Sequence, residues 1–357
     1  MTTSTCRAVV FNGDGTYHRR DDFAVPEPPA GGGVLKVEAV GMCGSDLAQL
    51  HGHQHVPGEK APLVPGHEIV GRVSALAADA DLGVAVGDRV AVDLIVRVPP
   101  TDTNPFGLGH LYGYTMGVDD DHGLWGGYGE YMGLLPGSHL MKLTEDTDAA
   151  ELTLFEPLAS VCNWFGLMPV VDGDTVVVQG PGHMGLVCAA EAKRRGAGTV
   201  IVTGTGMDGL RLEVAREVGA DMTIDVTAAD PVELVSGVTG GAMADMVVDL
   251  AADTVATVPL CLNLVRQGGK VLLAGLKNMA PVELVSDMIV LKGLTVQGGA
   301  GSTYDSMEES VAILNSGEFP TGPLLGEVFG LDRMDEAMAM LQRTADRDAV
   351  RVGLRHR

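Results

Sequence analysis

The sequence predicts an α/β protein in which a β-rich region precedes a doubly wound parallel sheet. Three observations lead to this prediction. Short apolar runs alternate with Gly and Pro turns up to about residue 160, strand-like and helix-like segments alternate after it, and a glycine-rich turn opens the second region. A chain of 357 residues also fits two domains better than one.

The first region has the pattern of an irregular β-rich domain. Four of its segments are short and apolar enough to be strands: residues 6–11, 33–39, 69–75 and 88–95. The segment 97–122 is rich in Pro, Gly and Asp and has no clear periodicity, so we expect a long loop there.

The second region alternates between apolar runs and helical patterns. The apolar runs are residues 176–179, 199–203, 222–225, 246–250, 271–274 and 294–297. Helical patterns between them cover residues 186–195, 210–218 and 254–265. Solid apolar strands separated by helices indicate a parallel sheet covered on both faces, and six of them favour a doubly wound nucleotide-binding fold. From about Tyr304 the pattern is helical and then β again at 350–354, so this part is expected to return to the first domain.

A glycine-rich turn lies where the first strand of the second region meets the following helix. Gly180 allows the tight turn, Gly182 lets backbone N–H groups approach a pyrophosphate, and Gly185 lets the helix pack on the strand. The helix would begin at His183 and Met184. A tight turn without a ligand is the alternative, but its place at the start of six alternating strands favours dinucleotide binding.

The loop after the second strand bears on the choice between NAD and NADP. Gly204 and Thr205 end that strand without the carboxylate that usually binds the ribose hydroxyls of NAD, and Asp208 comes slightly late. Arg211 is the nearest cation for a 2′-phosphate. The choice stays open, with a mild preference for NAD because the loop's only charge is negative, and Asp208 is equally suited to cap a helix.

Charge and cysteine content exclude several classes of protein. The formal net charge of −23 would repel nucleic acid and anionic membranes, so neither is expected as a partner. No apolar run reaches the length of a membrane span, and the first residues lack a secretion signal. Five scattered cysteines provide no disulfide framework. A soluble, intracellular, cytoplasmic protein is therefore expected.

Three polar signals in the first region suggest a metal site. Cys43 lies between glycines at a strand end, His67 and Glu68 precede a strand, and Glu156 lies near the expected domain junction. One thiolate, one imidazole and one or two carboxylates suit Zn²⁺ and leave room for a substrate oxygen. The alternatives are a buried cysteine with no ligand and a glutamate that caps a helix.

At this point the chain resembles the zinc-dependent medium-chain alcohol dehydrogenase family. The shared motifs occur in the family's order and spacing: Met42-Cys-Gly-Ser-Asp46, Gly66-His-Glu-x-x-Gly71, Val86-Gly-Asp-Arg-Val90, Gly126-Gly-Tyr-x-Glu-Tyr131, Glu156-Pro157 and Gly180-x-Gly-x-x-Gly185. The likeness extends from Cys43 to Gly298 and so covers most of the chain.

The resemblance implies a GroES-like catalytic domain, residues 1–160 completed by 305–357, around a Rossmann domain of residues 161–304, with the active site in the cleft between them. It implies that Cys43 and His67 bind a catalytic zinc. Either Glu68 or Glu156 would be the further ligand, the latter as in the polyol dehydrogenases. Ser45 would bond the alcohol oxygen and take up its proton while hydride passes to the nicotinamide.

Two departures from the family pattern have consequences. Residues 93–121 contain no cysteine where many members hold a structural zinc, so no structural zinc is expected. The histidine that many members carry five residues after the zinc cysteine is Ala48 here. The proton would leave through His51, His53 or water, although these histidines and His55 are equally suited to a solvated loop.

The leading prediction is a zinc-dependent, NAD(P)-dependent dehydrogenase of secondary alcohols or polyols, and by the same resemblance a homodimer or homotetramer. One alternative is a metal-free NADPH-dependent enone or quinone reductase of the same superfamily. A second is a dinucleotide-binding protein without turnover. The substrate is a small alcohol or carbonyl compound that the sequence does not identify. Aromatic residues near the expected cleft are more often packing residues than substrate contacts: Phe106, Tyr112, Tyr114, Trp125 and Trp164.

Overall fold

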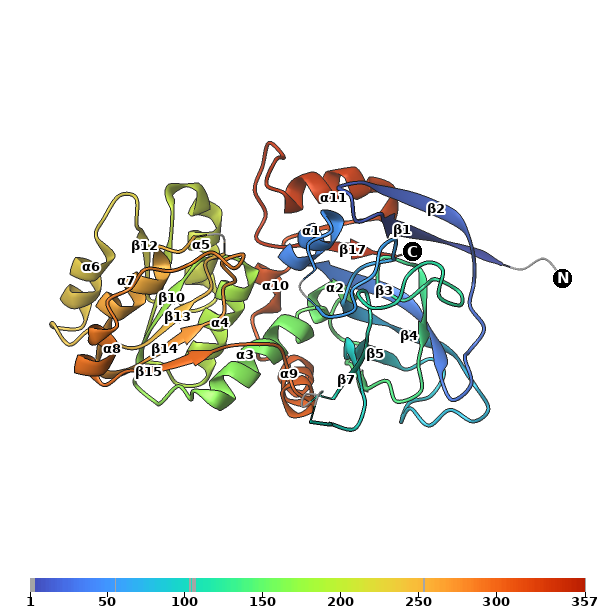
Figure 1. Ribbon diagram of the computed structural model, residues 1–357, viewed down its shortest axis with the longest axis horizontal. Coiled ribbons are helices and arrows are strands. Elements are labelled where there is room, and N and C mark those ends of the chain that lie inside the picture. Colours follow the sequence, from blue (N-terminus) through green and yellow to red (C-terminus); the bar gives the residue numbers. More distant parts are fainter. Residues whose placement is uncertain (1–3, 55, 103, 105–106, 253, 357) are drawn as a thin grey trace. The chain divides into compact units, whose positions relative to one another are not determined.

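The computed structural model describes residues 4–54, 56–102, 104, 107–252 and 254–356 (Figure 1). Within them the chain divides into two compact units. Unit 1 comprises residues 1–156, 311–317 and 325–357, and unit 2 comprises residues 157–310 and 318–324. Both chain ends therefore belong to unit 1, and the segment 318–324 belongs to unit 2.

Unit 1 is built mainly from short strands. Its strands are β1 (Thr5–Phe11), β2 (Tyr17–Ala24), β3 (Gly33–Met42), β4 (Glu68–Leu76), β5 (Arg89–Val92), β6 (Ile95–Arg97), β7 (Leu108–Leu111), β8 (Tyr131–Leu134), β9 (Leu140–Lys142), β16 (Glu327–Phe329) and β17 (Val352–Arg355). Its helices are α1 (Gly44–Leu50), α2 (Ala149–Leu152), the 3₁₀ turn η2 (Leu331–Arg333) and α11 (Met334–Leu341).

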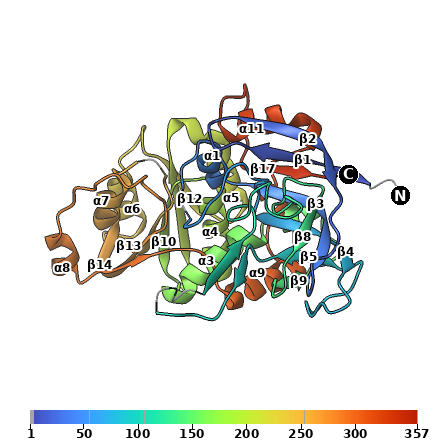
Figure 2. The ribbon, with the colours of Figure 1, turned by 45° about the vertical axis from the view of Figure 1, so that its right-hand side comes forward.

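The main sheet of unit 1 joins strands from both ends of the chain. Among the described residues its order is β16-β17-β3-β4-β5-β9, with β8 also paired to β3. β17 runs antiparallel to β3 and places Val352 opposite Met42, so the red C-terminal strand lies beside the blue β3 in both views (Figure 2). This pairing confirms that the end of the chain returns to the first region.

The expectation of a long loop over 97–122 was wrong in part. β7 lies inside this segment and pairs antiparallel with β6, with Ile95 opposite Leu111. Both residues pack with Tyr114 in a small buried cluster. The strand has only four residues, two of them Gly109 and His110, and so shows no apolar alternation in the sequence.

Unit 2 contains the predicted doubly wound sheet. Its strands are β10 (Thr175–Gln179), β11 (Thr199–Gly204), β12 (Met222–Asp225), β13 (Ala244–Asp249), β14 (Val265–Leu273) and β15 (Thr295–Gly298). Its helices are α3 (Phe155–Leu167, which begins at the end of unit 1), α4 (His183–Arg194), η1 (Gly206–Asp208), α5 (Gly209–Glu217), α6 (Pro231–Val238), α7 (Thr257–Leu264), α8 (Asp287–Lys292), α9 (Tyr304–Ser316, which ends in unit 1) and α10 (Thr321–Leu324).

In the described part of unit 2, the strand order is β12-β11-β10-β13-β14-β15 and every pair is parallel. The chain therefore moves outward from β10 in one direction and then restarts at β13 in the other. This reversal between β10 and β13 is the place where doubly wound sheets bind nucleotides. All six strands predicted from the sequence are present, which confirms the fold class.

Candidate active site

Cys43 lies at the junction between β3 and α1, where the sequence predicted a strand end. Its backbone N–H donates to the Asp46 carboxylate at 2.8 Å, which fixes the first turn of α1. The same carboxylate oxygen accepts a hydrogen bond from the Tyr128 hydroxyl at 2.9 Å. Both Asp46 and Tyr128 are fully buried, so the position of Cys43 is held from inside the unit.

His67 immediately precedes β4, and Gly66 makes its position possible. Gly66 has φ of +95°, and a Cβ there would approach the Tyr128 ring to 2.5 Å. Only glycine suits this position, because other residues rarely adopt a positive φ and every one of them has a Cβ that would meet the Tyr128 ring. The Gly126-Gly-Tyr motif thus supports the Gly-His-Glu motif by close packing.

The His67 imidazole has polar neighbours on both sides. Its Nδ1 lies 3.2 Å from the Tyr114 hydroxyl and 3.6 Å from the Asp46 carboxylate. The Cys43 sulfur is also within hydrogen-bonding reach of the ring. Burial lowers the pKa of His67, but Tyr114, Asp46 and Cys43 outweigh it and raise that pKa well above its usual value. Such a ring, held at Nδ1 by an acceptor, matches the second-neighbour support that metal-binding histidines receive.

Glu68 points into the same region but forms a buried ion pair with Arg351. Both side chains are almost completely inaccessible, and Arg351 also donates to Thr153 Oγ1 at 2.8 Å. Gly41 lies opposite Glu68 in the β3–β4 pairing, and a Cβ there would overlap both charged groups. Glu68 is therefore held by a fixed cation.

The donor atoms fit a metal ion. Ligand atoms of His67, Glu68 and Glu156 lie within 4.8 Å of one another, and Cys43 lies beside His67. Glu156 occupies the first turn of α3, at the last position of the first segment of unit 1. A soft sulfur, an imidazole nitrogen and carboxylate oxygens form the mixed set that suits Zn²⁺.

Ser45 lies on α1, two residues after Cys43. The Tyr114 hydroxyl donates to Ser45 Oγ at 3.1 Å, so Ser45, Tyr114 and His67 form one connected group. The sequence did not predict the roles of Tyr114, Tyr128, Asp46 and Arg351. Asp46 and Tyr128 belong to the motifs quoted above, and this membership was the one sign in the sequence that they have a role. Arg351 lies in no motif, so no pattern in the sequence indicated its role.

The remaining polar and aromatic candidates are dispersed. His51 follows α1 and is exposed, as is His53. The Tyr112 hydroxyl hydrogen-bonds the Ser138 hydroxyl, and the Trp125 indole N–H donates to the Asp120 carbonyl; both side chains are buried packing residues. Trp164 is buried within unit 2 beside Gly299. His55 and Phe106 lie outside the described residues.

The glycine-rich turn of unit 2 gives each glycine a different physical role. Gly180 has φ of +99° and backbone atoms of Ala251 within 3 Å of its missing Cβ. Gly185 packs against the Gly180 carbonyl so closely that a side chain would not fit. Gly182 caps α4 and has open space where a side chain would be. The helix that begins at His183, followed by Met184, thus presents backbone N–H groups to an open position, as pyrophosphate binding requires.

The loop after β11 holds its carboxylate internally. Asp208 accepts hydrogen bonds from the backbone N–H of Thr205 at 2.9 Å and from its hydroxyl at 2.8 Å. It is also mostly buried. A Cβ on Gly204 would come within 2.8 Å of Pro181 and 3.2 Å of Asp208, and Arg211 lies in the first turn of α5. Asp208 thus closes a capping box with Thr205 at η1 and makes no side-chain cap bond to α5, so the predicted N-cap role is met only in part. With this carboxylate engaged inside the loop, the loop's negative charge no longer argues for NAD.

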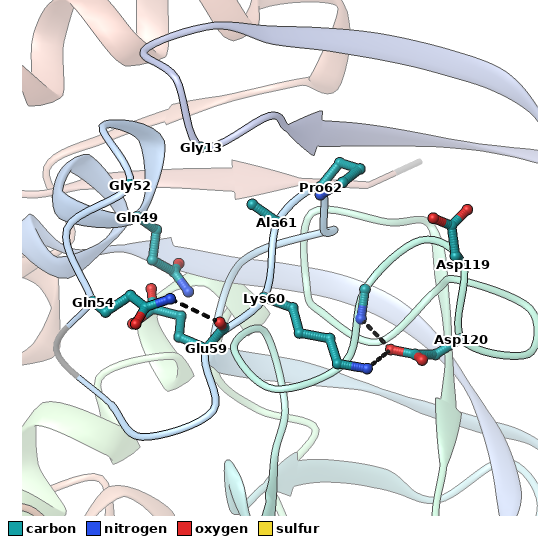
Figure 3. A pocket seen from close by; sticks show the side chains of 11 residues that line it. Gly13, Gln49, Gly52, Gln54, Glu59, Lys60, Ala61, Pro62, Asp119 and Asp120 are labelled. Atoms are coloured by element: carbon teal, nitrogen blue, oxygen red, sulfur yellow. Dashed lines mark hydrogen bonds and ion pairs between the residues drawn. The ribbon is translucent and has the colours of Figure 1, made fainter.

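Unit 1 also contains a surface hollow of about 530 Å³ beyond the C-terminal part of α1 (Figure 3). Gln49 extends toward it and donates to the Gly113 carbonyl at 2.7 Å. Lys60 crosses it to bond Asp120 at 2.6 Å. None of the predicted zinc ligands is among its lining residues.

Two family descriptions match the chain, one in each region. Residues 30–145 match the alcohol dehydrogenase GroES-like domain, and residues 184–316 match the zinc-binding dehydrogenase domain. In the described residues, no helix combines the length and apolar character needed to cross a membrane.

The chain is also similar to curated proteins over most of its length. It is 36% identical to a probable alcohol dehydrogenase of Mycobacterium tuberculosis, over 89% of each chain. It is 30% identical to a sorbitol dehydrogenase of Halalkalibacterium halodurans, over 90% of this chain and 93% of that one. It is 30% identical to an erythritol/L-threitol dehydrogenase of Mycolicibacterium smegmatis, over 98% and 97%.

Solved structures show the same fold. A zinc-binding dehydrogenase of Sinorhizobium meliloti bound to NADP superposes with a TM-score of 0.87 and 25% identity, over 99% of this chain and all of that one. The two family matches together cover more than half of the sequence, and the three curated relatives are 30% to 36% identical over 89% to 98% of it. This chain therefore belongs to the zinc-type medium-chain dehydrogenase/reductase family.

Proposed function

We propose that this protein is a zinc-dependent dehydrogenase that transfers hydride between a secondary alcohol or polyol and NAD(P). The observation that carries the proposal is the assembly of Cys43, His67 and Glu156 beside Ser45 within one compact unit. The alcohol, sorbitol and erythritol dehydrogenases among the relatives support the substrate class.

Cys43, His67 and Glu156 are proposed as the zinc ligands. Glu68 is proposed as a neighbouring carboxylate, because its ion pair with Arg351 already satisfies its charge. A zinc ion held there would polarise the carbon–oxygen group of the substrate and ease loss of the alcohol proton. Three protein ligands leave a position for the substrate oxygen, as catalytic zinc sites require.

The chain's own residues would position the reactants and manage the proton. Ser45 carries the hydroxyl that would bond the substrate oxygen and exchange a proton with it. Ala48 cannot pass that proton onward, so its exit would run through solvent or the exposed His51. In unit 2, the turn of Gly180, Gly182 and Gly185 would hold the dinucleotide, whose nicotinamide accepts the hydride.

Either dinucleotide is compatible with the loop after β11. Asp208 is engaged with Thr205, so NAD would lack the usual ribose-binding carboxylate there, while Arg211 offers a cation to a 2′-phosphate. The related structure with bound NADP supports NAD(P) use in general. The cofactor is therefore proposed as NAD or NADP, to be decided by assay.

A homodimer formed by unit 2 is proposed as the assembly, in the cytoplasm. β15 is an edge strand of the parallel sheet, and α8 beside it carries no buried residue. Val285, Val290 and Leu291 are each more than 60% exposed, and Val296 on β15 is 41% exposed. An open strand edge next to exposed apolar side chains favours pairing with a second copy.

The test measures zinc content and turnover together. Protein purified without added metal should hold about one zinc per chain and reduce NAD or NADP with sorbitol, erythritol or 2-propanol. Cys43→Ala should lose both properties, whereas the control Cys6→Ala, a buried cysteine of the same unit, should keep them. Wild-type protein that binds nicotinamide but holds no zinc would refute the proposal and favour a metal-free enone or quinone reductase. Zinc without any turnover would favour the non-catalytic alternative.

A further inference from the structure

The hydroxyl of Tyr114 joins two groups of the candidate site that the sequence treats separately. It donates to Ser45 Oγ at 3.1 Å and lies 3.2 Å from His67 Nδ1. Tyr114 is only 5% exposed, and its ring packs with Ile95 and Leu111. The buried Tyr114 hydroxyl thus faces two side chains of the site and not solvent.

We propose that Tyr114 is a positioning residue that fixes the orientation of both Ser45 and His67. The proposal rests on the dehydrogenase function proposed above and adds a residue to it. Tyr114 touches neither the expected metal position nor the substrate in this scheme, and acts only through the two side chains that it bonds.

The single hydrogen of the Tyr114 hydroxyl determines the direction of both of its polar contacts. A phenol has one hydrogen, and Tyr114 donates it to Ser45. At His67 the same oxygen can then only accept, so in the neutral ring that binds a metal, Nδ1 must carry the one imidazole hydrogen. The Asp46 carboxylate, 3.6 Å from this nitrogen, is also an acceptor and favours the same tautomer. Nε2 consequently keeps its lone pair, as a zinc ligand requires.

The direction of the Tyr114–Ser45 hydrogen bond also determines which hydrogen bond Ser45 can make to a substrate. Its oxygen accepts one bond from Tyr114, so its own O–H remains available for another acceptor. The substrate oxygen gains negative charge as the alcohol loses its proton, and a hydroxyl already aimed at it stabilises that charge without reorientation. Loss of the Tyr114 hydroxyl would let Ser45 rotate among several staggered positions.

The backbone of Tyr114 is held independently of its hydroxyl. The Gln49 amide donates to the Gly113 carbonyl at 2.7 Å, and Lys60 N–H donates to the Tyr114 carbonyl at 2.9 Å. Gly113 N–H in turn donates to the Trp125 carbonyl at 2.8 Å. Tyr114→Phe should therefore keep the chain path and the ring packing while it removes only the two polar contacts.

The experiment is a double-mutant cycle with Tyr114→Phe and Ser45→Ala. Activity is measured with the fastest of sorbitol, erythritol and 2-propanol, and zinc affinity is measured separately by competition with a chelator. We expect each single variant to lose about tenfold in kcat, because each removes one oriented hydrogen bond. Assayed with saturating zinc, the double variant should lose no more kcat than Ser45→Ala alone, since without Ser45 the phenol orients only His67, and zinc affinity reports that effect separately.

Zinc affinity supplies the readout that does not depend on turnover. Tyr114→Phe should weaken zinc binding about tenfold, the lower end for a group that supports a ligand, because Asp46 still faces His67. Ser45→Ala should leave zinc affinity unchanged. Tyr112→Phe is the matched control, since its hydroxyl bonds Ser138 at 2.6 Å and not the site, and it should change neither kcat nor zinc affinity.

Losses in kcat that multiply in the double variant, or a zinc affinity of Tyr114→Phe equal to that of the wild type, would overturn the proposal. If the wild-type protein oxidises no alcohol, the proposed function fails by itself. Zinc competition alone then decides: a tenfold weakening in Tyr114→Phe supports the positioning of His67, and no change refutes it.

Discussion

Acidification should destabilise unit 1 through one buried histidine, His356. It follows β17, and its Nε2 lies 2.8 Å from the Gly127 carbonyl. Within the described residues its Nδ1 has no hydrogen-bond partner. Burial lowers the pKa of His356 to about 4, although the Gly127 carbonyl and Glu130 act in the opposite direction. His356 is therefore neutral in the folded protein at pH 7.

The sign of the effect follows from comparing the folded and unfolded states. In an unfolded chain the pKa is about 6.5, so below that pH the unfolded state binds a proton that folded His356 refuses. The stabilisation is complete above about pH 6.5 and is lost as the pH falls toward 4. Between pH 7 and pH 5 the loss amounts to about 2 kcal/mol, and it reaches about 3 kcal/mol at pH 4.

Urea unfolding at pH 7 and pH 5 measures this loss. The chain has two tryptophans, so a Trp164→Phe background leaves Trp125 as a fluorescent reporter of unit 1. His356→Gln keeps an amide donor for the Gly127 carbonyl but cannot be protonated in this range. Its free energy of unfolding should fall by about 2 kcal/mol less than that of the parent between the two pH values. The exposed His53→Gln serves as the control. Equal pH dependence of parent and His356→Gln would refute the reasoning.

Three further outcomes are expected. Arg351→Met should lower the free energy of unfolding by about 3–5 kcal/mol, because it removes the guanidinium that faces the buried Glu68 carboxylate. Adding Glu68→Gln should restore much of the lost stability. A loss under about 1 kcal/mol for Arg351→Met in urea unfolding would contradict this prediction. Gly66→Ala should lower the free energy of unfolding by more than about 2 kcal/mol and reduce zinc content. Gly58→Ala, at a similar φ but in open space, should lower it by only about 1 kcal/mol. Equal losses for the two variants in urea unfolding would refute the packing argument. Leu291→Lys should convert a dimer into a monomer by light scattering, and an unchanged mass would exclude this edge as the interface.

Much of unit 2 was predictable because its order is local. Each of its six strands is a short apolar run of consecutive residues, and each glycine of the turn follows from a backbone requirement within six positions. The central strands β10, β11 and β13 are buried almost throughout, so they lack the polar interruptions that would hide a strand in the sequence. Sequence patterns report such features directly.

The parts that were missed depend on polar strands and distant pairs. β2 (Tyr17–Ala24) contains the run His18–Asp22, five charged or ionisable residues, and still pairs with β1. These side chains are tolerated because Phe23 is the one buried residue of the strand and the others are at least partly exposed. Arg351 and Glu68 are 283 positions apart, and Tyr114 meets Ser45 across 69 positions. Nothing in a local pattern marks two residues as partners when the fold alone brings them together.

The placement of β17 beside β3 also orders events during synthesis of the chain. All six strands of unit 2 lie between residues 175 and 298, so that sheet can be complete while later residues are still being added. The sheet of unit 1, begun first, must wait for Val352–Arg355, and the Glu68 carboxylate stays without its guanidinium until Arg351 emerges. Unit 2 can therefore mature before the unit that precedes it in the chain, and the candidate zinc site is among the last parts of the molecule to become fully organised.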